Sequence, residues 1–351
     1  MKETLISLSE YLELRQKLPI LDARSEGEFS QSHIPEAINI PILNDQERKT
    51  VGTLYKEEGS EKATLKGFEL VGPRFHQIQK EVIKRFPNRK IILYCWRGGM
   101  RSQILSWLLS MVGFEVFRLK GGYKTYRNFT FEEVRKKRNF IVLGGKTGTA
   151  KTVLLQHLKE AGEQVLDLED LAHHKGSAFG GIGQDPQPSV EQFENKLAEA
   201  LLQLNSDSPI WVENESRKIG RVILPDVFFS QMQASPHLDI SKSEHERIAH
   251  IESEYAGLPK EELKQAVKKL RKKLGGLRTK EALEAIEERD HPRWIQNLLT
   301  YYDKAYEFEL EKHPKEHTLN LDLTGLSLAK QIDLLIHSKD QLYERAKNTI
   351  D

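Results

Sequence analysis

The chain has 351 residues, of which 38% are hydrophobic and 30% are charged, and its formal net charge is +1. This length predicts two domains, each large enough to bury its own core, with the composition of ordinary globular proteins. The single cysteine excludes an intramolecular disulfide and a cysteine-rich zinc site. No apolar run approaches the roughly 18 residues that a membrane span needs, so we expect a cytoplasmic protein with no membrane partner.

The first part of the chain predicts short buried strands that alternate with helices. The segment MKETLISLSEYLELRQKL carries charges throughout and is typical of an amphipathic helix. Strands are predicted at LPILDARS, AINIPI and KIILYC, and helices around residues 5–17, 69–86 and 102–112. This alternation predicts an α/β domain, with a parallel sheet covered by helices on both faces. In such folds, sites form at the carboxyl ends of strands.

Cys95 lies at such a strand end and opens the glycine-rich segment CWRGGMR. Gly98 and Gly99 permit a backbone that points several N–H groups inward, and a helix that begins near Ser102 adds its positive end. Arg97 and Arg101 add full charges, so we predict a reactive thiolate at Cys95 inside an anion-binding loop. The loop fits both sulfur-group transfer and phosphate-ester hydrolysis, and the spacing of Cys95 and Arg101 does not decide between them.

The segments LDARSEGEFSQSHIPEAINIP and YCWRGGMRS together resemble the rhodanese homology domain. Asp22 and Arg24 match its opening signature. The run SHIPEAINIP is similar to its usual Gly-His-Ile-Pro-Gly-Ala run, with Ser32 and Glu36 in place of glycines. Tyr94 stands where the cysteine phosphatases usually have histidine, which favours the sulfurtransferase-like chemistry.

The segment NFIVLGGKTGTAKTVLLQHLKEAG predicts a strand, a tight glycine loop and a helix. Gly145, followed after four residues by Ala150, Lys151 and Thr152, fits the phosphate-binding loop, except that alanine replaces its last glycine. Backbone N–H groups and a helix N-terminus can hold phosphate oxygens, Lys151 adds a charge, and Thr152 offers a hydroxyl to a metal. The predicted phosphate-binding residues are Gly145, Lys146, Thr147, Gly148, Thr149, Ala150, Lys151 and Thr152.

Further strands are predicted at EQVLDLE, PIWVEN and HTLNLDL, which gives a second parallel sheet. Residues 171–189 form a long Gly- and Pro-rich loop that we expect near the phosphate site, and residues 243–310 are predicted to be helical. No aspartate ends a four-residue apolar run as a clear metal ligand, and the best candidates are Glu213 and Asp167. Nucleotide hydrolysis therefore does not follow from the loop, and a pocket for another diphosphate is an alternative. We assign no metal ligand, although Mg²⁺ could accompany a diphosphate.

Basic side chains are concentrated in two segments. Residues 118–138 hold eight of them and residues 260–280 hold nine. Such a local excess can attract a polyanion even when the whole chain is nearly neutral. A solvated helix face explains each segment equally well.

The order of these parts resembles the tRNA 2-selenouridine synthase family. A rhodanese-like domain, residues 1–128, is joined through LKGGYKTYR to a phosphate-loop domain, residues 129–351, which contains HHKGSAFG, PQPS and VENESRKIG. The resemblance implies that selenium replaces sulfur at C2 of a wobble 2-thiouridine, with selenophosphate as the donor and an S-geranylated intermediate made from geranyl diphosphate. Within these motifs, it makes Lys175, Ser177 and Arg217 further candidate site residues.

The resemblance also implies partners and a further pocket. We expect tRNA, bound at its anticodon region, and no tightly bound cofactor; selenophosphate synthetase is a suggested protein partner. An apolar pocket must hold the ten-carbon chain, and we place it near Phe179 or Trp211. Two alternatives remain, a rhodanese-type sulfurtransferase coupled to an ATPase, and a tRNA-binding protein whose two loops are relics.

Overall fold

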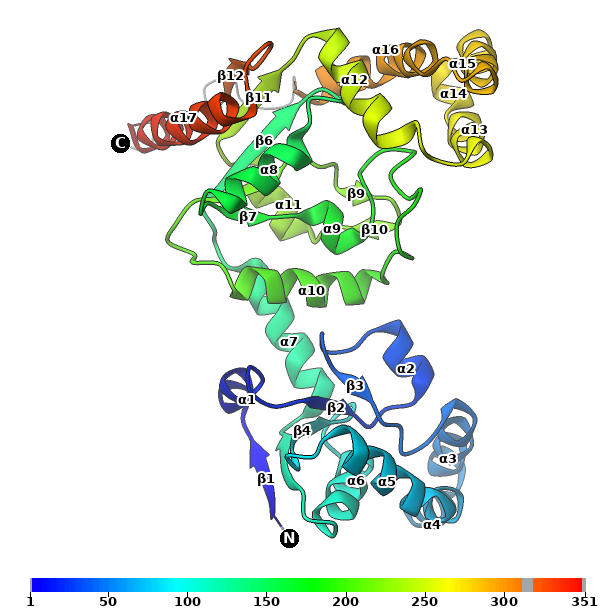
Figure 1. Cartoon of the computed structure of the whole chain (residues 1–351). Helices are drawn as coiled ribbons and strands as arrows, with labels where there is room; N and C mark the ends of the chain where they lie inside the picture. Colours follow the sequence, from blue (N-terminus) through cyan, green and yellow to red (C-terminus); the bar gives the residue numbers. More distant parts are fainter. Residues whose placement is uncertain (1, 311–317, 349–351) are drawn as a thin grey trace. The chain divides into compact units, whose positions relative to one another are not determined.

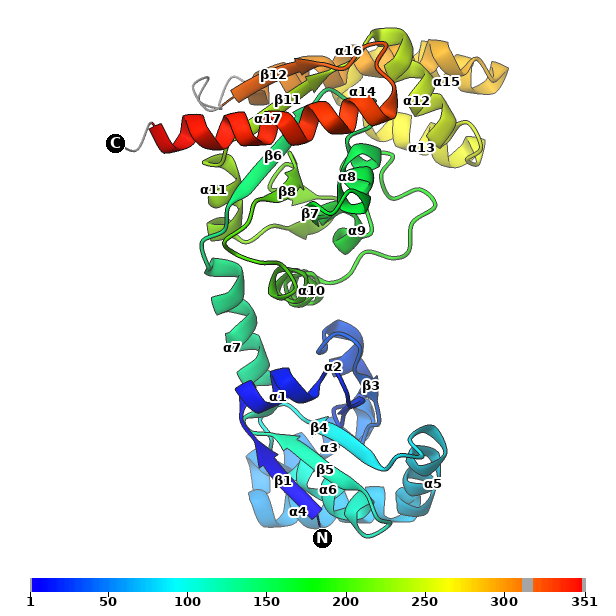
Figure 2. The same cartoon turned by 60° about the vertical axis from the view of Figure 1, so that its left-hand side comes forward.

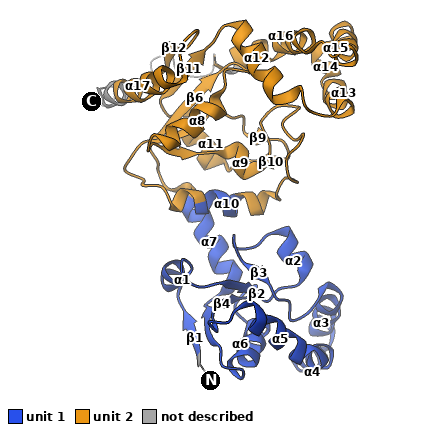
Figure 3. Cartoon of the chain, viewed as in Figure 1, with its two compact units in different colours: residues 1–133, 194–199 blue, residues 134–193, 200–351 orange. Residues whose placement is uncertain are grey.

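The computed structural model describes residues 2–310 and 318–348, and the chain divides into two compact units (Figures 1 and 3). Unit 1 comprises residues 1–133 and 194–199, and unit 2 comprises residues 134–193 and 200–351. The domain boundary expected after residue 128 lies within helix α7 (Gly122–Arg135).

Unit 1 contains a parallel sheet with the strand order β1-β5-β4-β2-β3, which confirms the predicted α/β class. Its elements are β1 (Lys2–Ile6), α1 (Leu8–Leu14), β2 (Ile20–Asp22), α2 (Glu26–Gln31), β3 (Ile38–Asn39), α3 (Asp45–Glu58), α4 (Ser60–Val71), the 3-10 helix η1 (Gly72–Arg74), α5 (Phe75–Arg85), β4 (Lys90–Tyr94), α6 (Met100–Ser110), β5 (Glu115–Leu119) and α7 (Gly122–Arg135).

The central strand β4 shows how both faces of this sheet are covered. Successive side chains of a strand point to opposite faces. Ile91 and Leu93 pack in one core with residues of α4, α5 and α6, whereas Ile92 and Tyr94 pack in another with residues of α1 and α7. The sheet therefore lies between two helical layers, as the alternating pattern predicted.

The prediction of one helix over the N-terminal segment was wrong for its first residues. Residues 2–6 form strand β1, which pairs in parallel with β5 at the edge of the sheet. The helix begins only at Leu8, because Ser7 accepts a hydrogen bond from the Glu10 N–H and closes a capping box. Helices α3 and α4 and strand β5 were not predicted either.

Unit 2 contains a second parallel sheet, with the order β12-β11-β6-β8-β7, and a short antiparallel hairpin, β9-β10. Its elements are β6 (Phe140–Gly145), α8 (Lys151–Glu160), β7 (Gln164–Leu166), α9 (Leu168–Ala172), α10 (Val190–Leu202, shared with unit 1), β8 (Ile210–Glu213), β9 (Lys218–Ile219), β10 (Val222–Ile223), α11 (Asp226–Gln233), β11 (His237–Ser241), α12 (Glu244–Tyr255), α13 (Lys260–Lys269), α14 (Arg271–Leu274), α15 (Gly276–Glu288), α16 (His291–Leu310), β12 (Thr318–Asp322) and α17 (Leu328–Asn348).

The predicted strands EQVLDLE, PIWVEN and HTLNLDL correspond to β7, β8 and β12. The first residue of the last segment, residue 317, lies outside the described residues. Strand β11, which lies between β6 and β12, was not predicted. Helices α8 and α17 pack against each other on one face of this sheet (Figure 2).

The helical prediction for residues 243–310 is confirmed by α12 to α16. These helices have an apolar core of their own, in which Phe179 of the long loop stacks on Trp294. The loop itself has no strand or α-helix between residues 173 and 189. Within the described residues, we find no helix that combines the length and the apolar character of a membrane span.

Candidate functional site

The loop that carries Cys95 is fixed by the start of α7. The Cys95 carbonyl accepts a hydrogen bond from the Tyr123 N–H at 2.8 Å, and the Trp96 carbonyl accepts one from the Lys124 N–H at 3.0 Å. Gly122 has a φ of 58°, and a Cβ at this position would lie 2.1 Å from the Cys95 carbonyl oxygen. Only glycine fits so close to the loop, so the GG of the LKGGYKTYR segment has a structural cause.

The Cys95 thiol is buried. Its side chain is part of the apolar core of unit 1, and the residue is 3% exposed. Sγ lies 3.2 Å from the Ser102 hydroxyl, which donates to the Gly99 carbonyl at 3.0 Å. The sulfur is thus more shielded than the sequence led us to expect, and in this conformation it packs as a small apolar side chain.

The two arginines of the loop have different surroundings. Arg101 is paired with Glu28, with Nη2 3.2 Å from Oε1, and Arg48 is a second partner of that carboxylate at 3.0 Å. Arg97 is exposed, and within residues 2–310 and 318–348 no hydrogen bond or ion pair holds its side chain. Arg97 is therefore the loop cation that is available to an anionic ligand.

The rhodanese-like signature lies beneath this loop. Arg24 donates from Nη2 to Asp22 Oδ2 and to the Ser32 carbonyl, both at 2.7 Å, and its guanidinium lies 4.1 Å from the centroid of the Tyr123 ring. Glu36 adopts a φ of 68°, in the region that favours glycine. This backbone conformation accounts for the glycine that the rhodanese pattern has at that position.

The phosphate loop joins β6 to α8 and has the conformation of a tight turn. Gly148 has a φ of 87°, and a Cβ there would lie 2.8 Å from the Arg247 carbonyl oxygen. Ala150 also has a left-handed conformation, with a φ of 66°. An alanine here costs roughly 1 kcal/mol relative to glycine. The alanine that departs from the motif thus keeps the backbone geometry of the loop.

Most of the predicted phosphate-binding residues line one pocket of about 270 Å³ in unit 2. The Lys151 ammonium donates to the Gly145 carbonyl at 2.9 Å and lies 3.4 Å from Glu213 Oε1. The candidates Lys175, Ser177 and Glu213 line the same pocket. The structure therefore brings the phosphate loop with Lys151, a second lysine, Lys175, and the Ser177 hydroxyl to one cavity. The lining residues from the phosphate loop are Gly145, Thr147, Gly148, Ala150, Lys151 and Thr152.

Four other candidates do not line this pocket. Lys146 is paired with Glu307 at 2.7 Å, and Thr149 is buried. Asp167 caps α9, where its side chain accepts the Asp170 N–H at 2.9 Å. Arg217 is paired with Asp226.

Two glutamates that the sequence did not single out complete the polar wall. Glu169 and Glu215 join Glu213, and one carboxylate oxygen from each of the three lies within 4.8 Å of the other two. The Thr152 hydroxyl lies 3.2 Å from both Glu169 and Glu213. Burial and the neighbouring carboxylates raise the pKa of Glu169 to about 10 and that of Glu215 to about 8. Three carboxylates and a hydroxyl are ligands that Mg²⁺ prefers, so these residues could hold it.

A small apolar pocket adjoins the phosphate pocket. The two share the lining residues Thr147, Ser177, Ile251, Tyr255 and Tyr302. Its remaining wall consists of Phe179, Trp294, Ile295, Leu298 and Leu299. We expected an apolar pocket near Phe179 or Trp211, and Phe179 does line this apolar pocket.

The other position, Trp211, is fully buried in the sheet core, where its indole N–H donates to Glu163 at 2.9 Å. We did not predict from the sequence the residues that α12 and α16 contribute to the two pockets. Their spacing is a signal that could have been used: His250 and Glu254 are four residues apart on one face of α12, and Tyr302 and Tyr306 are four residues apart on one face of α16.

The two basic segments also differ. In the first, Arg118 is paired with Glu3, and Arg127 with Glu194 inside unit 1, so both have structural roles. The second segment presents an exposed basic patch on α13 and α14, with side chains that make no hydrogen bond or ion pair among the described residues. The patch consists of Lys268, Lys269, Arg271 and Lys272.

Comparisons with known proteins give matches to both parts of the chain. Residues 7–129 match the rhodanese-like domain family, and residues 138–324 match the family described as the tRNA 2-selenouridine synthase AAA domain. A crystal structure of the N-terminal domain of a Clostridium difficile 630 protein is 41% identical and covers 36% of this chain and 98% of that chain, with a TM-score of 0.34.

Curated relatives match over most of the length of both chains. The tRNA 2-selenouridine synthase of Sulfurovum sp. strain NBC37-1 is 35% identical over 330 residues, which is 84% of this chain and 89% of that protein. That of Marinobacter nauticus is 35% identical over 335 residues, or 85% and 90% of the two chains. That of Nitrosomonas europaea is 36% identical over 346 residues, or 84% and 89%. The chain therefore belongs to the tRNA 2-selenouridine synthase family.

Proposed function

We propose that this enzyme replaces the C2 sulfur of a wobble 2-thiouridine in tRNA by selenium, in two transfers that use geranyl diphosphate and then selenophosphate. The name of its family supports the selenium modification of tRNA. The single observation that supports geranyl diphosphate is the pair of adjoining pockets in unit 2, one lined by the phosphate loop and the other by aromatic and aliphatic side chains. The apolar pocket has a volume of only about 30 Å³, so it must widen to hold a ten-carbon tail, but its position beside the phosphate pocket suits a diphosphate with an apolar tail.

The first transfer alkylates the sulfur. A thiocarbonyl sulfur attacks C1 of the geranyl group, the C1–O bond breaks with its electron pair going to the diphosphate, and the N3 proton of the base is lost. Positive charge where negative charge develops on the leaving group lowers the barrier. Lys151 and the N-terminus of α8 supply that charge, and Lys175 faces the same pocket.

The cluster of three carboxylates has a role in this transfer if Mg²⁺ enters with the diphosphate. Glu169, Glu213, Glu215 and the Thr152 hydroxyl would hold the ion. When bound, Mg²⁺ neutralises charge on a diphosphate. Without a cation, the protein itself lowers the repulsion in the cluster by keeping protons on Glu169 and Glu215, whose pKa values are raised by burial and by neighbouring carboxylates.

The second transfer exchanges sulfur for selenium. Alkylation has turned the sulfur into a good leaving group, so the selenium of selenophosphate can add at C2 while the C2–S bond breaks and releases geranylthiol after protonation. Water then takes the phosphoryl group from selenium, which releases phosphate and leaves the selenocarbonyl. We assign this step to the Cys95 loop, where Arg97 is available to hold the anion and the N-terminus of α6 adds its positive end. Selenophosphate synthetase is the protein partner that this donor suggests.

The anticodon region of tRNA needs a basic surface, and the exposed basic patch on α13 and α14 suits its phosphates. The target base must also leave its stack to enter a pocket.

The test is the reaction itself, with an anticodon stem-loop that contains 2-thiouridine. Geranyl diphosphate alone should give S-geranyl-2-thiouridine with release of diphosphate, and later addition of selenophosphate should give 2-selenouridine, both followed by mass spectrometry. Turnover of thiosulfate or ATP without RNA would favour the sulfurtransferase and ATPase alternative. A wild-type protein that binds the RNA but consumes neither donor would contradict the proposal.

A further inference from the structure

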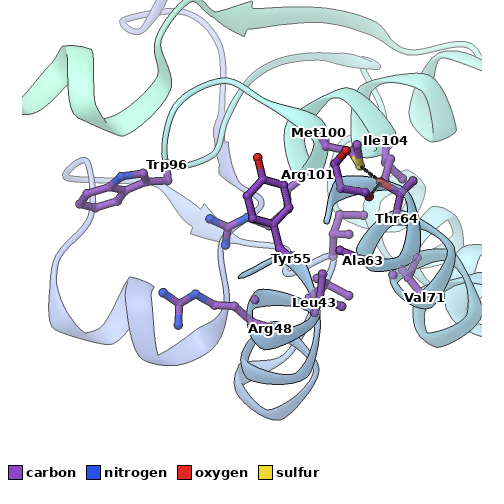
Figure 4. A pocket seen from close by; sticks show the side chains of 15 residues that line it. Leu43, Arg48, Tyr55, Ala63, Thr64, Val71, Trp96, Met100, Arg101 and Ile104 are labelled. Carbon is purple, nitrogen blue, oxygen red and sulfur yellow. Dashed lines mark hydrogen bonds between the residues drawn. The ribbon is translucent and has the colours of Figure 1, made fainter. Parts of the chain in front are cut away.

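Unit 1 contains an open cavity of about 530 Å³ beside the Cys95 loop (Figure 4). A volume of roughly 300 to 1,000 Å³ is typical of small-molecule sites. One wall comes from the loop and the start of α6, through Trp96, Met100 and Arg101. Cys95 itself does not line it. The remaining walls come chiefly from α3 and α4, so the cavity lies between these two helices and the loop to which we assign the selenium transfer.

Each of the two helices turns one regular face to the cavity. The lining positions are 48, 51, 52 and 55 on α3, and 60, 63, 64, 67 and 71 on α4. These spacings of three and four residues define a single face of a helix. Yet α3 buries no residue completely, and Tyr55 on its lining face is 62% exposed. On this face Val51 packs partly against the apolar core of unit 1, whereas Tyr55 stays largely open to the cavity side.

Two glycines keep the cavity open. Gly52 and Gly67 lie in the interiors of α3 and α4, both line the cavity, and neither has a positive φ. A Cβ added to either one would meet no atom within 4 Å, so neither glycine serves close packing or a special backbone conformation. Glycine is less favourable than alanine inside a helix. The presence of two glycines at the same cavity is explained if a larger side chain at either position would occupy the space that a ligand needs.

We infer that this cavity binds the prenyl chain of the S-prenylated 2-thiouridine during the selenium transfer. This inference rests on the proposed function, because the chain exists only if the first transfer occurs. The thioether carbon chain would lie between α3 and α4, while the base to which it is attached reaches the Cys95 loop. Binding the chain there holds the leaving group of the second transfer next to the selenium donor.

The lining of this cavity favours the thioether over the free diphosphate. Both arginines that line it, Arg48 and Arg101, are paired with the same carboxylate, Glu28. Lys151 and Lys175 of the phosphate pocket are also paired, with Glu213 and Glu254, but that pocket is lined by the phosphate loop, and the cavity of unit 1 is not. A diphosphate would therefore find no phosphate-binding loop in this cavity, and an uncharged prenyl thioether needs none.

The test uses the full-length protein and the variant Gly52→Phe, which fills the cavity, with Gly52→Ala as the matched control. The substrates are anticodon stem-loops that carry either S-geranyl-2-thiouridine or its five-carbon S-dimethylallyl analogue. Single-turnover formation of 2-selenouridine is measured with selenophosphate, and binding of the same RNAs is measured by fluorescence anisotropy. Gly52→Phe should slow the geranyl substrate by about tenfold or more, since the methylene groups that can no longer pack in the cavity are worth at least that much. The five-carbon substrate should be nearly unaffected, and Gly52→Ala should match the wild type.

Different outcomes separate this inference from the proposed function. If Gly52→Phe converts both RNAs at the wild-type rate, or slows both equally, the cavity does not hold the chain. If the wild type binds the geranyl RNA more tightly than the unprenylated one in a Gly52-dependent way but never forms 2-selenouridine, the cavity assignment stands and the proposed selenium transfer fails. If the Lys151→Ala protein binds geranyl diphosphate, and adding Gly52→Phe to it abolishes that binding, the cavity holds the free donor and the inference is overturned.

Discussion

Cys95 combines a shielded sulfur with a position in an anion-binding loop, and its substitution tests what the thiol does. We predict that Cys95→Ala abolishes 2-selenouridine formation, because the loop to which we assign selenophosphate is built around this residue. Geranylation should stay intact, because the phosphate loop and its pocket lie in unit 2. S-geranylated RNA should therefore accumulate, as measured by mass spectrometry. Cys95→Ser controls for packing, since serine nearly preserves the volume of this 3% exposed residue. Loss of both products from a folded Cys95→Ala protein would contradict the assignment.

Lys151 is the cation of the phosphate loop that faces the pocket, and its loss should affect the other transfer. Lys151→Ala should lower the rate of diphosphate release by about a hundredfold, the scale of removing one group that stabilises the developing charge. The matched control is Lys146→Ala, which removes the same charge from the same loop, but from a side chain that does not line the pocket. Equal losses in the two variants would show that the effect is not specific to the pocket.

The three clustered glutamates predict a pH-dependent response to Mg²⁺. The folded-state pKa of Glu215 is raised to about 8 by burial and by Glu213, so its contribution to stability is present below its unfolded pKa of 4.5 and is lost as the pH rises to about 8. Mg²⁺ needs ionised ligands and should displace these protons. The increase in Tm on adding Mg²⁺ should therefore be larger at pH 8.5 than at pH 6, measured by thermal unfolding. Glu215→Gln should reduce it, and an increase independent of pH would exclude the cluster as the site.

At the scale of the element, helices α13 and α14 carry the exposed basic patch, and charge reversal tests whether it binds RNA. The double variant Lys268→Glu and Lys272→Glu should weaken tRNA binding and lower the slope of log K against log salt by about one for each phosphate that is no longer neutralised. A double reversal on α5, Lys80→Glu and Lys84→Glu, changes the net charge equally at exposed positions and is the control. Unchanged affinity in the first variant would leave the patch as a solvated helix face.

Elements with a strong local pattern could be predicted from the sequence, and those that depend on distant pairing could not. The strand, glycine turn and helix of the phosphate loop are contiguous, so β6 and α8 were expected where they lie. Strand β1 was mistaken for helix because its five residues include two charged ones and are stabilised by β5, which is 109 or more residues away in the chain. The same limit applies to β11, whose neighbours β6 and β12 come from distant segments.

At the scale of the whole molecule, the candidate site was partly predictable for the same reason. Lys151 and Thr152 belong to one motif, but Glu169, Tyr255 and Tyr302 reach the pocket from three separate helices. Only the tertiary fold brings them together. The apolar cavity of unit 1 likewise could not be expected, because α3 and α4 have no motif and no pattern in their residues indicates a pocket between them.

The assignment of the two transfers to two compact units predicts complementation between defective chains. Cys95→Ala should make S-geranylated tRNA that it cannot convert, and Lys151→Ala should be unable to make it but able to use it. Because a thioether on tRNA is stable in water, the intermediate can dissociate and bind another molecule. A mixture of the two variants should therefore form 2-selenouridine from 2-thiouridine tRNA, geranyl diphosphate and selenophosphate, although each variant alone does not. Dilution should slow the mixture more than the wild type, since the intermediate must diffuse. No product from the mixture, with each variant shown to carry out its own transfer, would mean that the intermediate never leaves the chain that makes it.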